Sequence, residues 1–452
     1  MKMKKLLRTV ALFTLTALML TSFFGCGTSD NQSNSDQSQS GATNSSDTLS
    51  AKQLRFLSTW NETHDNAKLL MSLTDDYKKQ NPNLTIEMEV VPSDSLNKQV
   101  KVYIASGDTP DLFSYDSGAP LLELINGNAV VNIETEFTKM GIMDVFDEGA
   151  ISLLKKLVDD KGLYALPMGM NLEGIWYNKK IFSDNNLQVP TTWDQLLEVC
   201  KTLKSNNIQP FAAGGKDKWP LTRYINAYVM RKMGVDAMGK ASKGELSYTD
   251  PGFVEAADQL SEMAKAGYFG EGVNTVDNAA ATLMFLTGKV AMMYNGSWML
   301  ADLNNPDKNQ LGEDVGFFSV PTVNGGVGTL SDYSVNCGTI LAIGQQKYDD
   351  TTADWLKFVY TRIGDRAITD FGALKGYKIN NMPDNLPHYT KMVTDEFKKI
   401  KTAGLWFEAP FDDKTGTVAK DTAQLLFLGN MSGQEYFSHI QESTEEYLKA
   451  NK

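Results

Sequence analysis

The sequence predicts an α/β fold made of two lobes. Strand and helix patterns alternate along residues 54–113, and a second alternating unit begins near residue 164. Glycine- and proline-bearing stretches at 163–171, 320–336 and 371–380 suggest segments that cross between the two units. Alternating strands and helices favour parallel sheets covered by helices, so two such units with crossings predict two α/β lobes.

The first lobe begins with a short apolar strand at 54–57. A helix is predicted over 66–80, where apolar residues recur at helical spacing, and the alternating segment 84–91 indicates a second strand. Another helix is expected over 94–107, followed by a strand at 111–113. The order strand–helix–strand–helix–strand favours a parallel sheet, in which ligands bind beyond the carboxyl ends of the strands.

The second lobe is expected to contain a strand at 175–178 and a helix over 190–204, where Thr192 and Gln195 have the spacing of a capping box. A further helix starts at Asp250 and a strand covers 290–293. The later strand 337–344 and helix 352–361 are expected to return to the first lobe. Two lobes with several crossing strands form a cleft that can close on a ligand.

Composition excludes several classes of protein. The chain has 452 residues, of which 42% are hydrophobic, and a net charge of −12, so it is neither disordered nor collagen-like. No basic cluster follows the first residues, which argues against a nucleic-acid partner. The three cysteines and three histidines are scattered, so the sequence predicts no disulfide framework, no metal site and no cofactor.

The first residues predict export. Four basic residues precede an apolar run from Val10 to Phe24, which at about 15 residues is shorter than the roughly 20 needed to span a membrane. With Gly25-Cys26 at its end, this segment resembles a bacterial lipoprotein signal. We therefore predict a signal peptide over 1–25, acylation of Cys26 and a serine-rich flexible tether over 26–51. The alternative is an ordinary signal peptide with a chance cysteine.

Two loops that follow predicted strands combine an aromatic ring with an acid. Trp60 and Glu62 follow the first strand, and Tyr115 and Asp116 follow the third. An aromatic ring covers an apolar face of a ligand, while a carboxylate accepts hydrogen bonds from its hydroxyl groups. These loops are therefore candidates for a binding site.

Five local patterns together resemble the extracellular solute-binding proteins of ATP-driven carbohydrate importers. They lie at 104–116, 164–182, 190–204 and 285–298 and at the Val-Pro-Thr-Val beginning at Val320, and the resemblance covers about residues 52–447. It implies a two-lobe, type II periplasmic-binding-protein-like fold with a hinge. It also implies capture of a carbohydrate, an oligosaccharide in particular, and its delivery to membrane permease subunits by a monomer. The expected lobe boundaries are 52–164 and 331–375 for the first lobe, and 165–330 and 376–452 for the second.

The resemblance also implies which residues contact the ligand. It places Trp60, Glu62, Tyr115 and Asp116 in the cleft, and it matches Asn171 and Glu173 to a polar pair and Trp298 to an aromatic stacking position. Trp219, Asp332 and Trp406 lie in loops whose lengths vary, and complete the candidate set. Three other tryptophans lie in predicted elements and are expected in the core: Trp176, Trp193 and Trp355.

Two other function classes use similar features. A secreted glycoside hydrolase would combine cleft tryptophans with a pair of carboxylates about 5–10 Å apart, but no acid pair here has a recognisable catalytic setting. A sensor lipoprotein would present the same bound ligand to a membrane receptor. We expect a non-enzymatic receptor, anchored by lipid to the outer face of the cell membrane, and the lysine-rich export signal suggests a Gram-positive bacterium.

Overall fold

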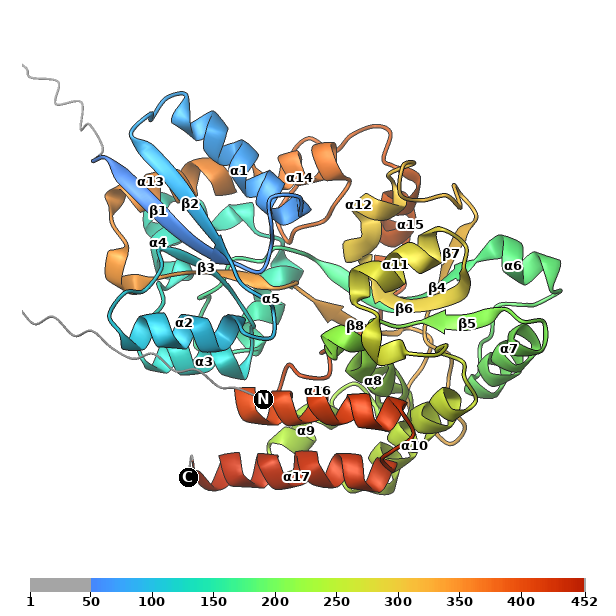
Figure 1. Ribbon diagram of the computed structural model, residues 1–452. Helices are drawn as coiled ribbons and strands as arrows, with labels where there is room; N and C mark the ends of the chain where they lie inside the picture. The colour runs from blue at the N-terminus through green and yellow to red at the C-terminus, as the bar shows by residue number, and fades with distance from the viewer. Residues whose placement is uncertain (1–49, 451–452) are drawn as a thin grey trace, which may run out of the picture. The chain divides into compact units, whose positions relative to one another are not determined.

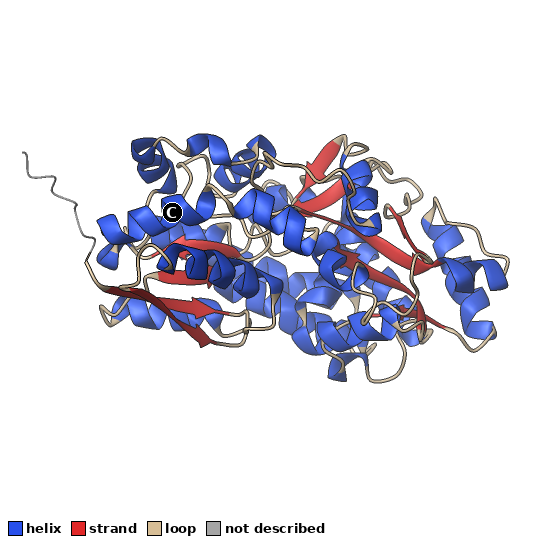
Figure 2. Ribbon diagram, turned by 90° about the horizontal axis from the view of Figure 1, so that it is seen from above, coloured by secondary structure: helices blue, strands red, loops and turns tan. Residues whose placement is uncertain are grey.

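The computed structural model describes residues 50–450 (Figure 1). The predicted signal peptide, Cys26 and almost all of the predicted tether lie outside the described residues. Within 50–450, the apolar side chains pack around two separate sheets, which are visible as two groups of strands in Figure 2. We call the parts built on the smaller and the larger sheet the first and second lobe.

The first lobe has a four-stranded sheet in the order β2-β1-β3-β9. The central strand β1 is parallel to β2 and β3, as the alternating pattern predicts, and β9 is antiparallel to β3. Its elements are β1 (Lys52–Ser58), α1 (Asp65–Lys78), β2 (Leu84–Val90), α2 (Leu96–Ala105), β3 (Leu112–Tyr115), α3 (Ala119–Asn126), α4 (Ile133–Met140), α5 (Glu148–Lys156), β9 (Ile340–Ile343), α13 (Asp350–Tyr360) and α14 (Ile363–Phe371).

The second lobe has a six-stranded sheet in the order β10-β8-β4-β6-β5, with β7 also paired to β4. Helices α16 and α17 run side by side along the lower edge of Figure 1. The lobe's elements are β4 (Asn171–Asn178), α6 (Lys179–Asp184), α7 (Trp193–Ser205), β5 (Gln209–Ala212), α8 (Trp219–Met233), α9 (Ala237–Ser242), α10 (Pro251–Lys265), α11 (Asn278–Leu286), β6 (Val290–Gly296), α12 (Leu300–Leu303), β7 (Val315–Phe318), β8 (Asp332–Asn336), α15 (His388–Phe397), β10 (Thr402–Gly404), α16 (Asp413–Phe427) and α17 (Gly433–Ala450).

Helix α7 begins as the sequence predicts. The Gln195 backbone N–H donates to the Thr192 hydroxyl at 3.3 Å, and the Thr192 N–H donates to Gln195 Oε1 at 3.2 Å. This reciprocal pair satisfies two of the backbone donors that a helix start leaves free. The predicted free thiol on this helix, Cys200, is fully buried in the second lobe's core.

Two crossings between the lobes lie side by side. Leu166 pairs with Leu341 next to the smaller sheet, and Asn171 pairs with Asn336 in the larger one. The chain therefore passes between the lobes at 167–170 and again at 337–339. Gly338 has φ of +69°, a left-handed conformation that glycine adopts without steric cost.

Residues 332–336 lie in the second lobe, although the sequence places them in the first. Residues 331–375 are assigned to the first lobe by the sequence, yet 332–336 form β8 of the larger sheet, between β4 and β10. The crossing therefore comes after β8, where Asn336 ends the pairing with β4. Conversely, Ala165, Leu166 and Met168 pack in the first lobe's core rather than the second.

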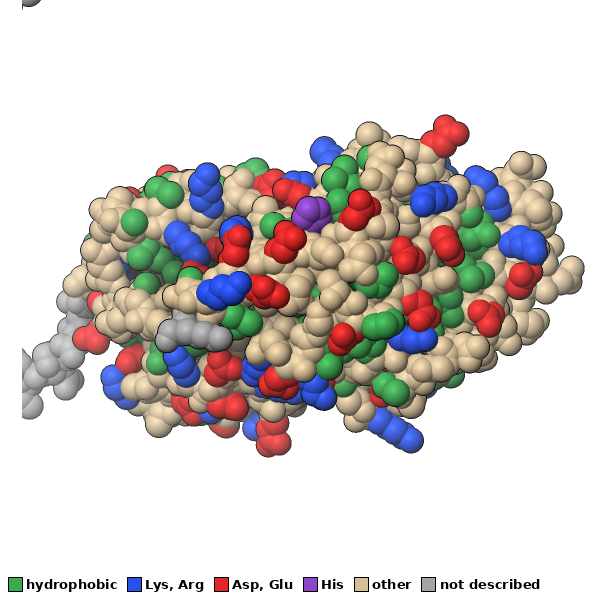
Figure 3. All heavy atoms as spheres, turned by 90° about the horizontal axis from the view of Figure 1, so that it is seen from below, with side chains coloured by type: hydrophobic (Ala, Val, Ile, Leu, Met, Phe, Trp, Pro, Cys, Tyr) green, Lys and Arg blue, Asp and Glu red, His purple; other side chains and the backbone are tan. Residues whose placement is uncertain are grey.

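Within residues 50–450, no helix combines the length and apolarity that a membrane span requires. On the face seen from below, acidic and basic side chains are interspersed (Figure 3). This face shows no broad patch of a single charge.

Candidate functional site

A cluster of aromatic and charged side chains forms where four parts of the second lobe meet. The start of β4 contributes Glu173, the first turns of α8 contribute Trp219 and Arg223, the turn after β6 contributes Trp298, and the loop after β10 contributes Trp406 with Glu408. We call these six residues the tryptophan–arginine cluster. Four of them are candidates from the sequence: Glu173, Trp219, Trp298 and Trp406.

Glu173 is the most deeply buried member, with 1% of its surface exposed. Its Oε1 accepts hydrogen bonds from Asn336 Nδ2 at 2.8 Å and from Arg223 Nη1 at 3.1 Å. Its second oxygen, Oε2, is buried and accepts no hydrogen bond from the described residues. A buried carboxylate oxygen without a donor costs free energy, so this atom favours a hydrogen-bond donor that approaches it.

Arg223 links the acids and the rings. Its Nη2 lies 3.6 Å from Glu408 Oε2, and its guanidinium carbon lies 5.5 Å from the ring of Trp219 and 5.8 Å from that of Trp406. Burial by itself would lower the pKa of Arg223, but the carboxylates of Glu173 and Glu408 raise it above its ordinary value. The guanidinium therefore stays charged and fixed between two acids.

The tryptophan side chains of the cluster are half-buried. Trp219 and Trp298 meet edge to face, with ring centroids 5.8 Å apart and an angle of 70° between their planes. Trp406 is also half-buried. Such rings offer apolar faces beside hydrogen-bonding groups, the combination that binds the faces and hydroxyls of a sugar.

Asn171 braces the start of β4. Its Nδ2 donates to Asn336 Oδ1 at 3.2 Å, and its Oδ1 accepts from the Ser297 hydroxyl at 3.3 Å. Asn336 in turn donates to Glu173. Asn171 thus positions the neighbours of the cluster, and its own amide is already used.

The first lobe faces this region through the loop after β3. Asp116 is exposed and accepts from Asn97 Nδ2 at 3.1 Å, and the same amide donates to Asp413 of the second lobe at 2.9 Å. A Cβ on Gly118 would lie 2.4 Å from the carbonyl oxygen of Ala409, so the two lobes touch here.

The pKa of Asp116 is raised, mainly because neighbouring protein atoms displace water. Lys420 opposes this shift, and the acids Asp413 and Glu408 add to it. The preceding residue, Tyr115, is fully buried, and its hydroxyl has no hydrogen-bond partner among the described residues. Burial raises the pKa of Tyr115 well above its ordinary value, so the hydroxyl remains protonated and able to donate.

Trp60 and Glu62 form no ring contact, hydrogen bond or ion pair with the tryptophan–arginine cluster among the interactions of the described residues. The Trp60 ring is buried, with 5% of the residue exposed: it stacks on His64 with centroids 5.8 Å apart and meets Phe56 edge-on. Its backbone N–H donates to Ser58 Oγ at 2.9 Å. Glu62 is exposed in the same loop. Packing in the first lobe therefore accounts for most of the Trp60 surface.

Asp332 is not brought to the cluster. It is the first residue of β8, at the opposite end of that strand from Asn336, and its carboxylate accepts the Thr329 N–H at 2.6 Å. This contact closes the turn before β8. Asn336 is the fourth residue after it along the strand, about 13 Å away at the usual rise.

Three residues in or next to the cluster were not predicted from the sequence: Arg223, Glu408 and Asn336. Each is an ordinary polar residue whose role depends on partners distant in the chain, such as Glu173. One signal was present: Arg223 follows Trp219 by four residues, the spacing of neighbours on one helix face. The three tryptophans expected in the core are indeed buried: Trp176, Trp193 and Trp355.

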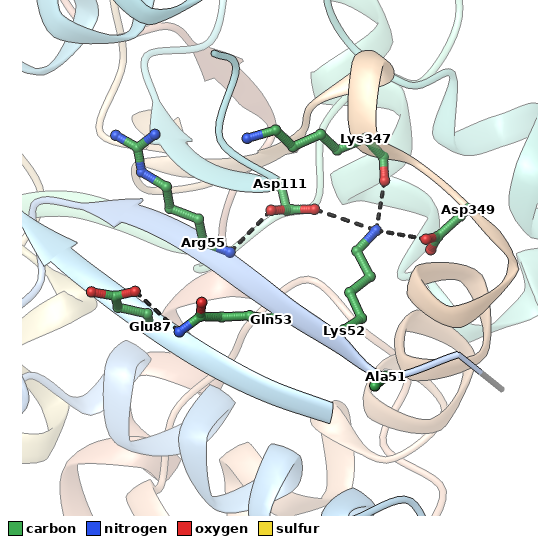
Figure 4. Close-up of a pocket in the computed structure, with 8 residues that line it drawn as sticks. All are labelled: Ala51, Lys52, Gln53, Arg55, Glu87, Asp111, Lys347 and Asp349. Atoms are coloured by element: carbon green, nitrogen blue, oxygen red, sulfur yellow. Dashed lines mark hydrogen bonds and ion pairs between the residues drawn. The ribbon is translucent and has the colours of Figure 1, made fainter. Parts of the chain in front are cut away.

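A shallow cavity of about 540 Å³ lies elsewhere, at the beginning of β1 (Figure 4). Lys52 contacts Asp111 at 3.3 Å and Asp349 at 3.0 Å there, and Arg55 pairs with Glu89 and Asp108. The charges of these two basic residues are therefore matched within the protein. The lining of this cavity reaches Arg55, three residues or about 10 Å before the end of β1 at Ser58.

No three His, Cys, Asp or Glu side chains of residues 50–450 are grouped as metal ligands would be. The side chains of the tryptophan–arginine cluster can form hydrogen bonds and stacking contacts.

Known proteins resemble this chain in both sequence and fold. The family model for bacterial extracellular solute-binding proteins matches residues 60–362. The multiple sugar-binding protein of Streptococcus mutans is 24% identical over 261 residues, which are 56% of this chain and 59% of that protein. This chain thus spans a little over half the length of the relatives it matches.

Solved structures match over more of the chain. A chitin oligosaccharide binding protein superposes with a TM-score of 0.79 at 23% identity, covering 88% of this chain and 98% of that one. A structure from a study of xylan utilization by the thermophilic bacterium Caldanaerobius polysaccharolyticus gives a TM-score of 0.78 at 25% identity, covering 86% and 99%. The two-lobe solute-binding fold expected from the sequence is confirmed.

Proposed function

Because this chain belongs to the bacterial extracellular solute-binding protein family, we propose that it captures a carbohydrate, specifically an oligosaccharide, between its lobes and delivers it to the permease subunits of an ATP-driven importer. One observation carries the ligand class: two half-buried tryptophans, Trp219 and Trp406, lie beside the Glu173–Arg223 pair, and Trp298 packs against Trp219. Sugars present apolar ring faces and hydroxyl groups together, and this cluster offers a partner for each.

The names of similar proteins support the same ligand class. The Streptococcus mutans relative is named for multiple sugars, and a Rhizobium meliloti relative, 21% identical over 251 residues, for alpha-glucosides. A structure of a protein named RafE in complex with raffinose matches with a TM-score of 0.66. These names support a carbohydrate as the ligand of this chain.

The mechanism we propose is closure of the two lobes on the ligand. The ligand would contact the cluster in the second lobe and the loop carrying Tyr115 and Asp116 in the first. It stabilises the closed state only by binding that state more tightly than the open one. The adjacent crossings at 167–170 and 337–339, with glycine at 338, supply a place where the backbone can bend.

We propose further that export and acylation of Cys26 anchor the protein to the outer face of the cell membrane, with the polar stretch 26–51 as a tether. The export signal and the family's extracellular members support this. Labelling cells with a fatty-acid analogue tests it: wild type should carry the label and Cys26→Ala should not.

We propose that the protein is a receptor and not an enzyme. The two acids of the cluster, Glu173 and Glu408, both contact Arg223, whereas a glycoside hydrolase needs one acid that is protonated and one free base or nucleophile. A sensor lipoprotein would use the same cleft. Neighbouring permease genes would favour transport, and a histidine kinase gene without permeases would favour sensing.

The direct test is calorimetry with residues 51–452 against mono- and oligosaccharides, with tryptophan fluorescence and product analysis in parallel. We expect binding at micromolar concentration or below without change in the sugar. Cleavage of a sugar would establish the enzyme instead. Absence of binding to every sugar would contradict the ligand class.

A further inference from the structure

The positive charge of the tryptophan–arginine cluster is already matched by acids. Arg223 Nη1 contacts Glu173 at 3.1 Å and its Nη2 lies 3.6 Å from Glu408. Sites that bind a carboxylate or phosphate usually present an arginine whose paired nitrogens are free to form two parallel hydrogen bonds. In this cluster Glu173 accepts a hydrogen bond from Nη1, and the Glu408 carboxylate lies at ion-pair distance from Nη2.

The remaining buried atoms require a ligand group that both donates and accepts. Glu173 Oε2 and Arg223 Nε have no hydrogen-bond partner of good geometry within the described chain, and the Tyr294 hydroxyl is a nearby protein group that also interacts with Glu173. A hydroxyl can donate to one and accept from the other. A carboxylate can only accept, so it would leave Glu173 Oε2 without a partner.

The surroundings add to this preference. Burial among protein atoms that displace water is the main cause that raises the pKa of Asp116 of the first lobe. Lys420 and a hydrogen bond from Asn97 oppose this shift, and the charges of Asp413 and Glu408 add to it. Asp413 itself pairs with Lys101 at 2.7 Å. An anionic ligand entering between the lobes would lose water and meet carboxylates on both sides.

We propose that the Glu173–Arg223–Glu408 bridge selects uncharged saccharides and rejects sugar acids. This inference rests on the proposed function and narrows its ligand class. Glu408 is the specificity-determining residue, because it places a negative charge 3.6 Å from Arg223 Nη2, one of the nitrogens that an acidic sugar would need. Glu408 is also held in place by a hydrogen bond from the Thr222 hydroxyl.

The test compares matched probes by calorimetry: maltotriose, raffinose and N,N′-diacetylchitobiose, each beside a counterpart with one primary hydroxyl oxidised to a carboxylate. For whichever neutral probe binds, we expect the acidic counterpart to bind at least about tenfold more weakly. Glu408→Gln keeps the size of the side chain and can keep the Thr222 contact, but it removes the negative charge beside Arg223. The acidic probe should then bind more tightly, so the ratio of the two dissociation constants, acidic over neutral, should fall at least about threefold.

The matched control is Glu271→Gln, which removes one negative charge from an exposed loop and should leave the ratio unchanged. Thermal unfolding checks that each variant is folded. Equal or tighter binding of an acidic probe to wild type, or an unchanged ratio in Glu408→Gln, overturns the selection by charge while sugar binding stands. Failure of all six probes and of the wider sugar panel overturns the proposed function, and this inference with it.

Discussion

At the scale of single residues, Arg223 holds two acids of the second lobe in place. Removing its charge by Arg223→Met would leave the fully buried Glu173 carboxylate without its ionic partner. Breaking a buried ion pair in this way typically destabilises a protein by about 3–5 kcal/mol. We therefore expect a lower unfolding midpoint in urea.

The double variant Arg223→Met with Glu173→Gln tests the cause. It removes both charges, and the oxygen of the new amide can still accept from Asn336, so the double variant should recover part of the lost stability. If the double variant is as unstable as the sum of both single variants, the ion pair is not the source of the effect.

Trp298 is the aromatic residue whose loss should affect binding most directly. Trp298→Ala removes a half-buried ring that meets Trp219 edge to face. Loss of an aromatic ligand contact commonly costs about 1–3 kcal/mol, so affinity for the sugar should fall by roughly tenfold or more. Calorimetry measures it, and Trp298→Phe should retain most of the affinity. Unchanged affinity in a folded Trp298→Ala protein would remove this residue from the site.

Lys375 gives the protein a pH-dependent stability. Its ammonium donates to Asn66 Oδ1 at 2.6 Å beside His64, and burial lowers its pKa to about 8, with Asp65 opposing the shift. Below pH 8 both states are protonated and the cost of burying the charge is present in full. Between pH 8 and about 10.5 only the folded state loses its proton, so stability rises with pH.

The measurement is urea unfolding of wild type and Lys375→Met between pH 7.5 and 10. Wild-type stability should rise relative to the variant by up to about 3 kcal/mol. Lys391→Met, at an exposed position, should follow wild type across this range. Parallel curves for wild type and Lys375→Met would contradict the prediction.

The residues of the candidate site were predictable only where local sequence carries the signal. Tryptophans beside polar residues in expected loops pointed to Trp219, Trp298 and Trp406, which lie in or beside one cluster. Asp332 also lies in an expected loop, but in the structure its carboxylate accepts the Thr329 N–H in the turn before β8. Arg223 and Glu408 could not be found this way, because their pairing joins positions 185 residues apart in the chain.

At the scale of elements, periodicity and caps carry most of the information. Helix α7 is an example: its capping box was legible in the sequence and is present. Thr192→Ala should cost about 1 kcal/mol, because one backbone N–H at the helix start loses its acceptor. Chemical unfolding measures the change.

Thr202→Ala provides the matched control, since the same substitution inside α7 removes no cap and alanine favours a helix. It should leave the midpoint unchanged or raise it slightly. Equal losses for both variants would show that the cap contributes nothing specific.

Strand β8 shows where element prediction ends. Its sequence mixes polar and apolar residues, and all five are buried between β4 and β10. Alternation predicts a strand with one buried face, so it cannot assign such a segment to a sheet. The partners that decide its lobe, β4 and β10, lie more than sixty residues away in either direction.

At the scale of the whole molecule, Asp413 joins the lobes. It lies at the start of α16 in the second lobe and contacts Lys101 at 2.7 Å and Asn97 at 2.9 Å, both on α2 of the first lobe. Asp413→Ala removes both contacts. The ligand-free protein should then populate more open arrangements, with a larger radius of gyration by X-ray scattering.

Opening also lowers the fraction of molecules ready to bind, and apparent affinity falls in proportion to that fraction. A partly exposed ion pair contributes only about 0–1 kcal/mol, so the loss of sugar affinity should not exceed about fivefold. Lys414→Ala breaks the neighbouring Lys414–Glu446 pair, which lies within the second lobe, and should change neither radius nor affinity. A loss of affinity in Asp413→Ala without a larger radius would mean that Asp413 acts on the ligand itself and not on the balance between open and closed lobes.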